Sequence, residues 1–86
     1  MAYTISLDPA AARELKKLDP RLCQELGIVI SALADDPRPP RAKKQIGSAS
    51  SYRIRVRDHR ILYRITDREL LVLVVRIGNR RDVYRE

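Results

Sequence analysis

Three arginines near the middle of the chain have a spacing that suits the binding of phosphate. Arg53 and Arg55 alternate with apolar residues, and Arg60 begins a second run of the same kind. Because successive side chains of a β-strand point to opposite faces, the alternation predicts that all three guanidinium groups lie on one face of a sheet. Each guanidinium presents a planar fork of N–H donors that can bind two phosphate oxygens at once.

A row of arginines can also be no more than a solvated sheet face, since such a face must be polar. Lys and Glu would serve that purpose equally well, yet this pattern uses Arg almost exclusively and has no matching set of acidic residues. Like charges held together repel one another unless an anion offsets them. The residue choice therefore favours an anion-binding face.

The net charge of the chain points to the same region. The 86 residues include 18 Lys and Arg against 11 Asp and Glu, for a net charge of +7. Residues 1–36 carry four basic and six acidic side chains, residues 37–50 carry four basic and no acidic ones, and residues 51–86 carry ten basic and five acidic ones. The positive excess thus lies wholly from residue 37 onward, which predicts a polyanionic partner.

Length and composition exclude several classes of protein. We expect a single folded domain over residues 1–86, because 44% of the chain is hydrophobic and no room remains for a second core. The longest apolar run, residues 70–75, is far shorter than the roughly 20 residues of a membrane span, and we expect no leader because the first residues lack a charged-then-apolar pattern. One cysteine, Cys23, and one histidine, His59, exclude an internal disulfide and a structural zinc site. We expect a cytoplasmic protein without metal, cofactor or membrane contact.

Two Asp-Pro pairs mark the starts of two predicted helices. Asp8 and Asp19 can each accept backbone N–H bonds at an N-cap, and proline fits the first helical position. Apolar residues at helical spacing follow both pairs, and a third such pair, at residues 36–37, disfavours helix beyond residue 35. The sequence therefore predicts an antiparallel helical hairpin over about residues 9–18 and 20–35.

Four other stretches are typical of β-strands. The predicted strands are residues 3–7, 52–57, about 60–66 and 70–77, with turns at 58–59 and 67–68 and a basic loop over 37–50. Residues 70–77 are nearly all apolar, which is typical of a central strand covered on both faces. We predict an α+β fold of the order β-α-α-β-β-β. A small antiparallel sheet carries the helical hairpin on one face and the arginines on the other.

Four short motifs in the second half of the chain are distinctive: Tyr-Arg-Ile-Arg at 52–55, the run from His59 to Tyr63, Gly78 with Arg80, and Val83 with Tyr84. In these motifs, and over essentially its whole length, the chain resembles the RelE toxins of the RelE/ParE superfamily, which belong to bacterial and archaeal type II toxin–antitoxin systems. The resemblance implies a metal-free endoribonuclease that cuts mRNA in the ribosomal A site. It also implies a RelE-like fold and a cognate antitoxin that holds the enzyme inactive.

The catalytic set comes from the same resemblance, position by position. The residues implied are Arg53 and Arg55 on the first long strand, Arg60 on the next strand, Arg80 after the last strand with Arg81 as the alternative, and Tyr84. Arg60 and Arg80 would stabilise the charge that the phosphate gains when the 2′-hydroxyl attacks it. Tyr84 would either stack on a base or act as a general base. The expected products are a 2′,3′-cyclic phosphate and a 5′-hydroxyl.

One departure from the family pattern concerns the proton donor. Relatives place lysine where this chain has Arg53 and Arg55, and guanidinium, with a pKa above 12, is a poor acid. Either these arginines act only electrostatically, or His59 beside Arg60 donates the proton to the leaving oxygen.

Other cations are candidates for contact with RNA or the ribosome. They are Arg41, Lys43, Lys44, Arg57, Arg64 and Arg81. A solvated loop is an equally good interpretation of Arg41, Lys43 and Lys44. Where they do contact phosphates, the binding should depend on salt.

Two alternatives to the nuclease remain at this point. A ParE-like toxin shares the fold but inhibits DNA gyrase without cutting RNA, and a degenerate toxin would serve only as an antitoxin partner. The set of Arg60, Arg80 and Tyr84, which gyrase inhibitors generally do not keep as a whole, favours the nuclease. The apolar run at 70–75 beside a basic face predicts an acidic, amphipathic antitoxin segment that folds as it binds. Such an antitoxin would carry a DNA-binding N-terminal half.

Overall fold

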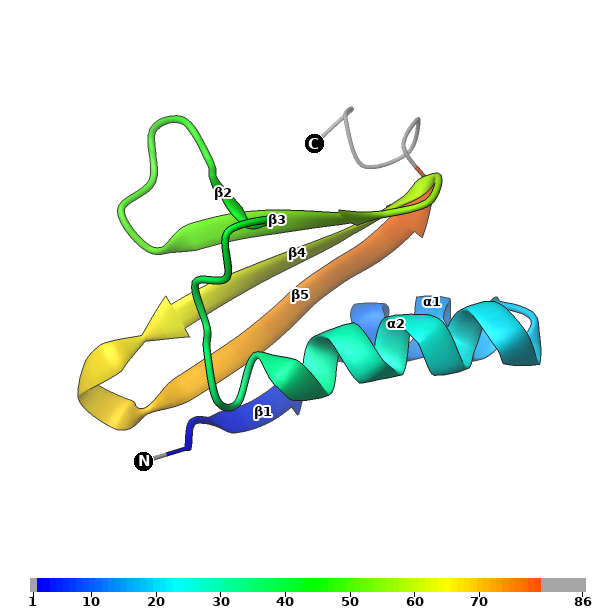
Figure 1. Ribbon diagram of the computed structural model, residues 1–86, viewed down its shortest axis with the longest axis horizontal. Helices are drawn as coiled ribbons and strands as arrows, with labels where there is room; N and C mark the ends of the chain where they lie inside the picture. Colours follow the sequence, from blue (N-terminus) through cyan, green and yellow to red (C-terminus); the bar gives the residue numbers. More distant parts are fainter. Residues whose placement is uncertain (1, 80–86) are drawn as a thin grey trace.

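The computed structural model describes residues 2–79 and contains two helices packed on a five-stranded mixed sheet (Figure 1). The elements in chain order are β1 (Thr4–Leu7), α1 (Pro9–Lys17), α2 (Pro20–Ala32), β2 (Lys43–Lys44), β3 (Ser51–Val56), β4 (His59–Thr66), the 3₁₀ turn η1 (Asp67–Glu69) and β5 (Leu71–Asn79). The predicted α+β class and the helical hairpin are confirmed. Neither helix in this part of the chain is long and apolar enough to cross a membrane.

Both helices begin at the predicted caps. The Asp8 carboxylate accepts a hydrogen bond from the backbone N–H of Ala10 at 3.0 Å, and the Asp19 carboxylate accepts one from Leu22 at 3.0 Å. Each cap is followed by proline in the first turn, where a missing N–H costs nothing. The second helix ends at Ala32, three residues before the predicted boundary.

The sheet has the strand order β1-β5-β4-β3-β2, and β1 runs parallel to β5. The prediction of an entirely antiparallel sheet is therefore wrong at this pair, whereas the other three pairs are antiparallel. A fifth strand, β2, also forms within the predicted basic loop and pairs with β3. Local alternation shows which face a residue occupies but does not specify the neighbour or the direction of a strand.

The hydrophobic core lies between the helices and one face of the sheet. Its fully buried side chains come from α1, α2 and strands β3 to β5, and the largest are Leu26, Leu33, Ile54, Ile61, Tyr63, Val72, Val74 and Ile77. On β5 only Val72, Val74 and Ile77 are buried side chains of this core, while Leu71, Leu73 and Val75 are half-buried. The predicted cover on both faces of this strand is thus incomplete, and the middle strand of the sheet is β4.

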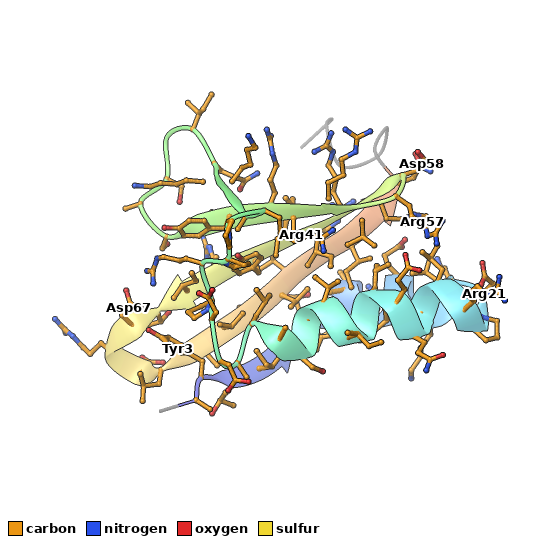
Figure 2. The ribbon with its side chains drawn as sticks, in the orientation of Figure 1. Tyr3, Arg21, Arg41, Arg57, Asp58 and Asp67 are labelled. Carbon is orange, nitrogen blue, oxygen red and sulfur yellow. The ribbon has the colours of Figure 1, made fainter. Side chains whose placement is uncertain are left out.

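A cluster at one end of the sheet holds the start of the loop that joins α2 to β2. The Arg38 guanidinium donates to both Asp67 carboxylate oxygens at 3.2 and 2.8 Å, and its Nε donates to the Tyr52 hydroxyl at 3.1 Å. It also lies 5.5 Å from the centre of the Tyr52 ring, a cation–π distance. Tyr3 donates to Asp67 at 2.6 Å, and both residues lie at the same end of the molecule (Figure 2). We call these four residues the Arg38 clasp.

The loop residue just before Arg38 is held from inside the core. The buried Tyr63 hydroxyl donates to the carbonyl oxygen of Pro37 at 2.8 Å, and the Tyr63 ring stacks on that of Tyr52 with centres 5.9 Å apart. Tyr63 is thus a fully buried core side chain whose hydroxyl holds the loop. Together with the Arg38 clasp, this bond fixes the point from which the basic loop crosses the sheet.

The Arg38 clasp should make stability depend on pH. Hydrogen bonds from Arg38 and Tyr3 hold the pKa of Asp67 below its ordinary value. A lowered folded-state pKa means that the stabilisation is complete above the ordinary pKa and is lost as the pH falls through the lowered one. In urea unfolding, Asp67→Asn should be less stable than the wild type at pH 7, and the difference should shrink as the pH falls below the ordinary pKa of an aspartate.

The matched control is Asp58→Asn, which removes an exposed carboxylate from the β3–β4 turn. Its unfolding midpoint should follow that of the wild type across the whole range. An Asp67→Asn difference that is absent at pH 7, or that persists unchanged at low pH, would contradict the role of the clasp.

Candidate functional site

Five cations line a cavity of about 230 Å³ on the sheet. They are Arg41, Lys43, Arg53, Arg55 and Arg60, and we call this site the arginine cavity. The structure therefore brings together Arg53, Arg55 and Arg60 as the alternation predicts. In Figure 2 nitrogen-tipped side chains gather above β3, on the side away from α1 and α2. Among residues 2–79 every side chain that lines the cavity is a cation, so this part of the chain offers it N–H donors and positive charge.

Strand pairing determines how closely these cations approach. Arg55 on β3 lies directly opposite Arg60 on β4, and Lys43 on β2 lies directly opposite Arg53. The Cβ atoms of such pairs are about 5 Å apart, and like charges at this distance destabilise a sheet. Arg60 is also only 5% exposed, so its guanidinium is held among neighbouring side chains. This repulsion would be relieved by an anion bound between the two strands.

The loop cations divide between two faces. Arg41 donates from Nη2 to the carbonyl oxygen of Arg55 at 2.7 Å, which ties the loop to β3 beside the cavity. Lys43 pairs with Arg53 and faces the cavity, whereas Lys44 pairs with Tyr52 and therefore faces the other side of the sheet. Of the three predicted loop contacts, Arg41 and Lys43 thus line the cavity and Lys44 does not.

The predicted position of Arg57 is wrong. The residue has a positive φ of 56°, which ends the alternation of β3, and its guanidinium donates to the Glu25 carboxylate of α2 at 2.6 and 3.1 Å. This pairing raises the pKa of Arg57 and lowers that of Glu25. Figure 2 shows Arg57 beside α2, away from the cations above β3. Arg64 is exposed and lies on the same face of β4 as Arg60, but it is outside the cavity lining.

His59 also falls on the wrong side for the role considered for it. It pairs with Val56, a core residue, and it precedes Arg60 in the same strand. Neighbouring residues of a strand point to opposite faces, so His59 faces the helix side and does not line the arginine cavity. Its Nδ1 is buried, without a hydrogen-bond partner in the region from residue 2 to residue 79. The geometry thus contradicts His59 as the proton donor at the cavity.

Two tyrosines are kept in their protonated form. Burial raises the pKa of Tyr63 to about 12, and the hydrogen bond to Asp67 raises the pKa of Tyr3. Neither hydroxyl lies at the arginine cavity. The predicted site residues Arg80, Arg81 and Tyr84 lie outside the described residues. The strand that precedes them ends beside the cavity, since Gly78 pairs with Arg60.

One cation on this face was not identified as a functional candidate from the sequence. Arg76 of β5 pairs with Leu62, which in turn pairs with Arg53, so all three side chains share the face of the arginine cavity. The apolar run around Arg76 indicates a buried strand and gives no local signal for this placement. The signal is the break in register on β5, which only the structure reveals.

Comparison with known proteins agrees with this geometry. The family model of the ParE toxin of type II toxin–antitoxin systems matches residues 5–84. The toxin RelG of Mycobacterium tuberculosis is 35% identical and covers 99% of both chains, and the mRNA interferase toxin RelE of Escherichia coli is 30% identical over 100% of this chain and 94% of its own.

Solved structures match equally well. The isolated RelE toxin of E. coli has a TM-score of 0.82 at 27% identity, covering 98% of this chain and 93% of that one. A RelBE toxin–antitoxin complex from M. tuberculosis has a TM-score of 0.80 at 28% identity, covering 93% and 100%. The likeness extends over sequence, fold and the whole length of the domain, and the chain therefore belongs to the RelE/ParE family of toxins of type II toxin–antitoxin systems.

Proposed function

We propose that this toxin is a metal-independent endoribonuclease that cuts mRNA in the A site of the ribosome and thereby inhibits translation. The observation that carries the proposal is the arginine cavity, in which Arg55 and the nearly buried Arg60 lie directly opposite each other on neighbouring strands and line the same cavity. A relative named as an mRNA interferase, 30% identical over the whole chain, supports the same chemistry.

The cleavage step uses the RNA's own 2′-hydroxyl. Its oxygen attacks the adjacent phosphorus and loses its proton to a base, for which Tyr84 is the candidate. The bond from phosphorus to the 5′-oxygen breaks, and a proton from water completes the 5′-hydroxyl. The products are a 2′,3′-cyclic phosphate and a 5′-hydroxyl end. The added negative charge on the phosphate is stabilised by cations already fixed in place, principally Arg60 and Arg55, with Arg80 joining them.

The remaining cations fit a role in binding the ribosome. Because ribosomes work in the cytoplasm, the protein would act there. Arg41 and Lys43 widen the positive surface at the cavity, and the exposed Lys44 and Arg64 extend it on either face of the sheet. Arg81 belongs to the same predicted group. Contacts of this kind act on RNA phosphates and weaken as salt increases.

A cognate antitoxin is the proposed inhibitor. Relatives of this chain have been solved in complex with antitoxins, including RelBE complexes from E. coli and M. tuberculosis. An acidic, amphipathic segment would complement both the arginine cavity and the half-buried Leu71, Leu73 and Val75 of β5. Such an antitoxin, with a DNA-binding N-terminal half, would cover the site that RNA requires.

The activity can be tested by primer extension on mRNA from translating ribosomes. The wild type should produce cuts within A-site codons, and Arg60→Ala should lower the rate by about 100-fold, since it removes a fixed cation from the transition state. Arg60→Lys, which retains the charge, should keep part of the rate. Circular dichroism and antitoxin binding identify variants that are folded.

Two results would contradict the nuclease proposal. A wild-type protein that produces no cuts and inhibits DNA supercoiling by gyrase would be a ParE-like toxin. The matching family model carries the name of the ParE toxin. A folded Arg60→Ala variant that cuts at the wild-type rate would remove the arginine cavity from the mechanism.

His59 should be dispensable for the reaction. Because it faces the helix side of the sheet, His59→Ala should leave both the cleavage rate and its pH profile within about two-fold of the wild type. A rate loss of more than ten-fold, with a changed acidic limb of the pH profile, would return His59 to the role of proton donor.

The two roles considered for Tyr84 can be separated by Tyr84→Phe, because phenylalanine keeps the stacking surface and lacks the hydroxyl. If Tyr84 is the base, the reaction requires its hydroxyl, and the single-turnover rate of Tyr84→Phe should fall by roughly 100-fold or more. A near-normal rate in Tyr84→Phe together with a weakened RNA affinity in Tyr84→Ala would assign it to stacking alone.

A further inference from the structure

A one-residue irregularity in β5 determines where Arg76 points. Val72 and Val74 face the core, so in a regular strand residue 76 would face the core as well and residue 77 would face away. The register between β4 and β5 shifts between Leu62 and Tyr63, which inserts an extra residue on β5. Beyond this shift Ile77 is fully buried and Arg76 is turned to the opposite face. Bulges that re-aim a side chain in this way are frequent beside active sites.

The face that receives Arg76 is the one that carries the arginine cavity. Lys43, Arg53, Leu62 and Arg76 form one row across four adjacent strands. With neighbouring strands about 4.8 Å apart, Arg76 lies two strands, or roughly 10 Å, beyond Arg53 in this row. It is also the diagonal neighbour of Arg60, which stands two residues from Leu62 on β4.

The residue between the two arginines keeps the row compact. Leu62 is only 6% exposed although neither α1 nor α2, the helices among residues 2–79, lies on its face of the sheet. Its cross-strand neighbours Arg53 and Arg76 and its strand neighbours Arg60 and Arg64 are all arginines, whose aliphatic stems can cover it while their charged ends reach solvent. Leu62 thus separates Arg53 from Arg76 without interrupting the positively charged surface of the row.

Within residues 2–79 this face carries more cations than one phosphodiester carries negative charges. A phosphodiester carries a single negative charge, whereas the arginine cavity alone has five cations in its lining. A row about 10 Å long accommodates more than one phosphate of a single strand, since stacked nucleotides advance about 3.4 Å each and extended ones advance further.

We propose that Arg76 forms a second phosphate-binding subsite, which holds a nucleotide adjacent to the one cut at the arginine cavity. The RNA strand would then cross the sheet from β2 toward β5, perpendicular to the strands. This inference rests on the proposed nuclease function and adds to it the path of the substrate. Arg76 acts in binding and positioning, and the scissile phosphate remains at Arg55 and Arg60.

The test measures the affinity of the isolated toxin for a fluorescent RNA tetranucleotide that carries a 2′-deoxy sugar at the cut, so that it binds without reacting. Arg76→Ala should weaken binding by roughly 5- to 10-fold, as expected for the loss of one charge-assisted contact. The slope of log affinity against log salt should fall by about 0.7. Arg76→Lys should retain most of the affinity.

Neutral methylphosphonate linkages locate the contact. If Arg76 binds the adjacent phosphate, the penalty of Arg76→Ala should disappear when that one linkage is neutral and persist when another one is, as in a double-mutant cycle. Arg68→Ala is the matched control, because it removes the same charge from an exposed position in η1 and should leave the affinity unchanged.

The outcomes separate the two proposals. A wild-type toxin that cuts mRNA on the ribosome, with Arg76→Ala matching Arg68→Ala in affinity and salt dependence, overturns the second subsite alone. The second subsite is also overturned if Arg76→Ala lowers the RNA affinity by the same factor whichever linkage is neutral. A wild-type toxin that neither binds the oligonucleotide nor cuts mRNA overturns the nuclease function and the subsite with it. Urea unfolding of Arg76→Ala excludes a loss of fold as the cause.

Discussion

Mutual repulsion of cations on one sheet face is the constraint on which the rest of this structure depends. Arg55 and Arg60 lie directly opposite each other, and Lys43 and Arg53 do the same one row away. Such pairs destabilise a free sheet, so the burial of apolar residues on the other face must compensate for them. In the proposed function the same repulsion favours phosphate binding, because an anion bound between the cations would lower it.

The scaffold holds this arrangement from two sides. Behind the sheet, core residues of α1 and α2 pack against strands β3 to β5 and keep the strands in register. At its edge, the Arg38 clasp and the Tyr63–Pro37 hydrogen bond fix the loop that delivers Arg41 and Lys43 to the cavity. The Arg57–Glu25 pair ties the β3–β4 turn to α2 and holds Arg57 away from the arginine cavity. In the proposed nuclease, preorganisation of this kind would let the cations stabilise a transition state without moving.

Much of the fold and the centre of the site follow from local patterns. The Asp-Pro caps gave both helix starts, and strict alternation placed Arg53, Arg55 and Arg60 together. The errors arise where the structure depends on long-range or backbone effects. The positive φ of Arg57 redirects its side chain, β2 forms only because β3 is beside it, and the β5 bulge turns Arg76 outward. None of these has a signature in periodicity alone.

The chemical nature of the RNA ends tests the central claim most directly. Mass spectrometry of fragments released from ribosome-bound mRNA by the wild-type toxin identifies the group left at each end. Attack by the internal 2′-hydroxyl, stabilised by fixed arginines, predicts a 2′,3′-cyclic phosphate on one fragment and a 5′-hydroxyl on the other. A 3′-hydroxyl paired with a 5′-phosphate would show that water is the nucleophile and would contradict the account.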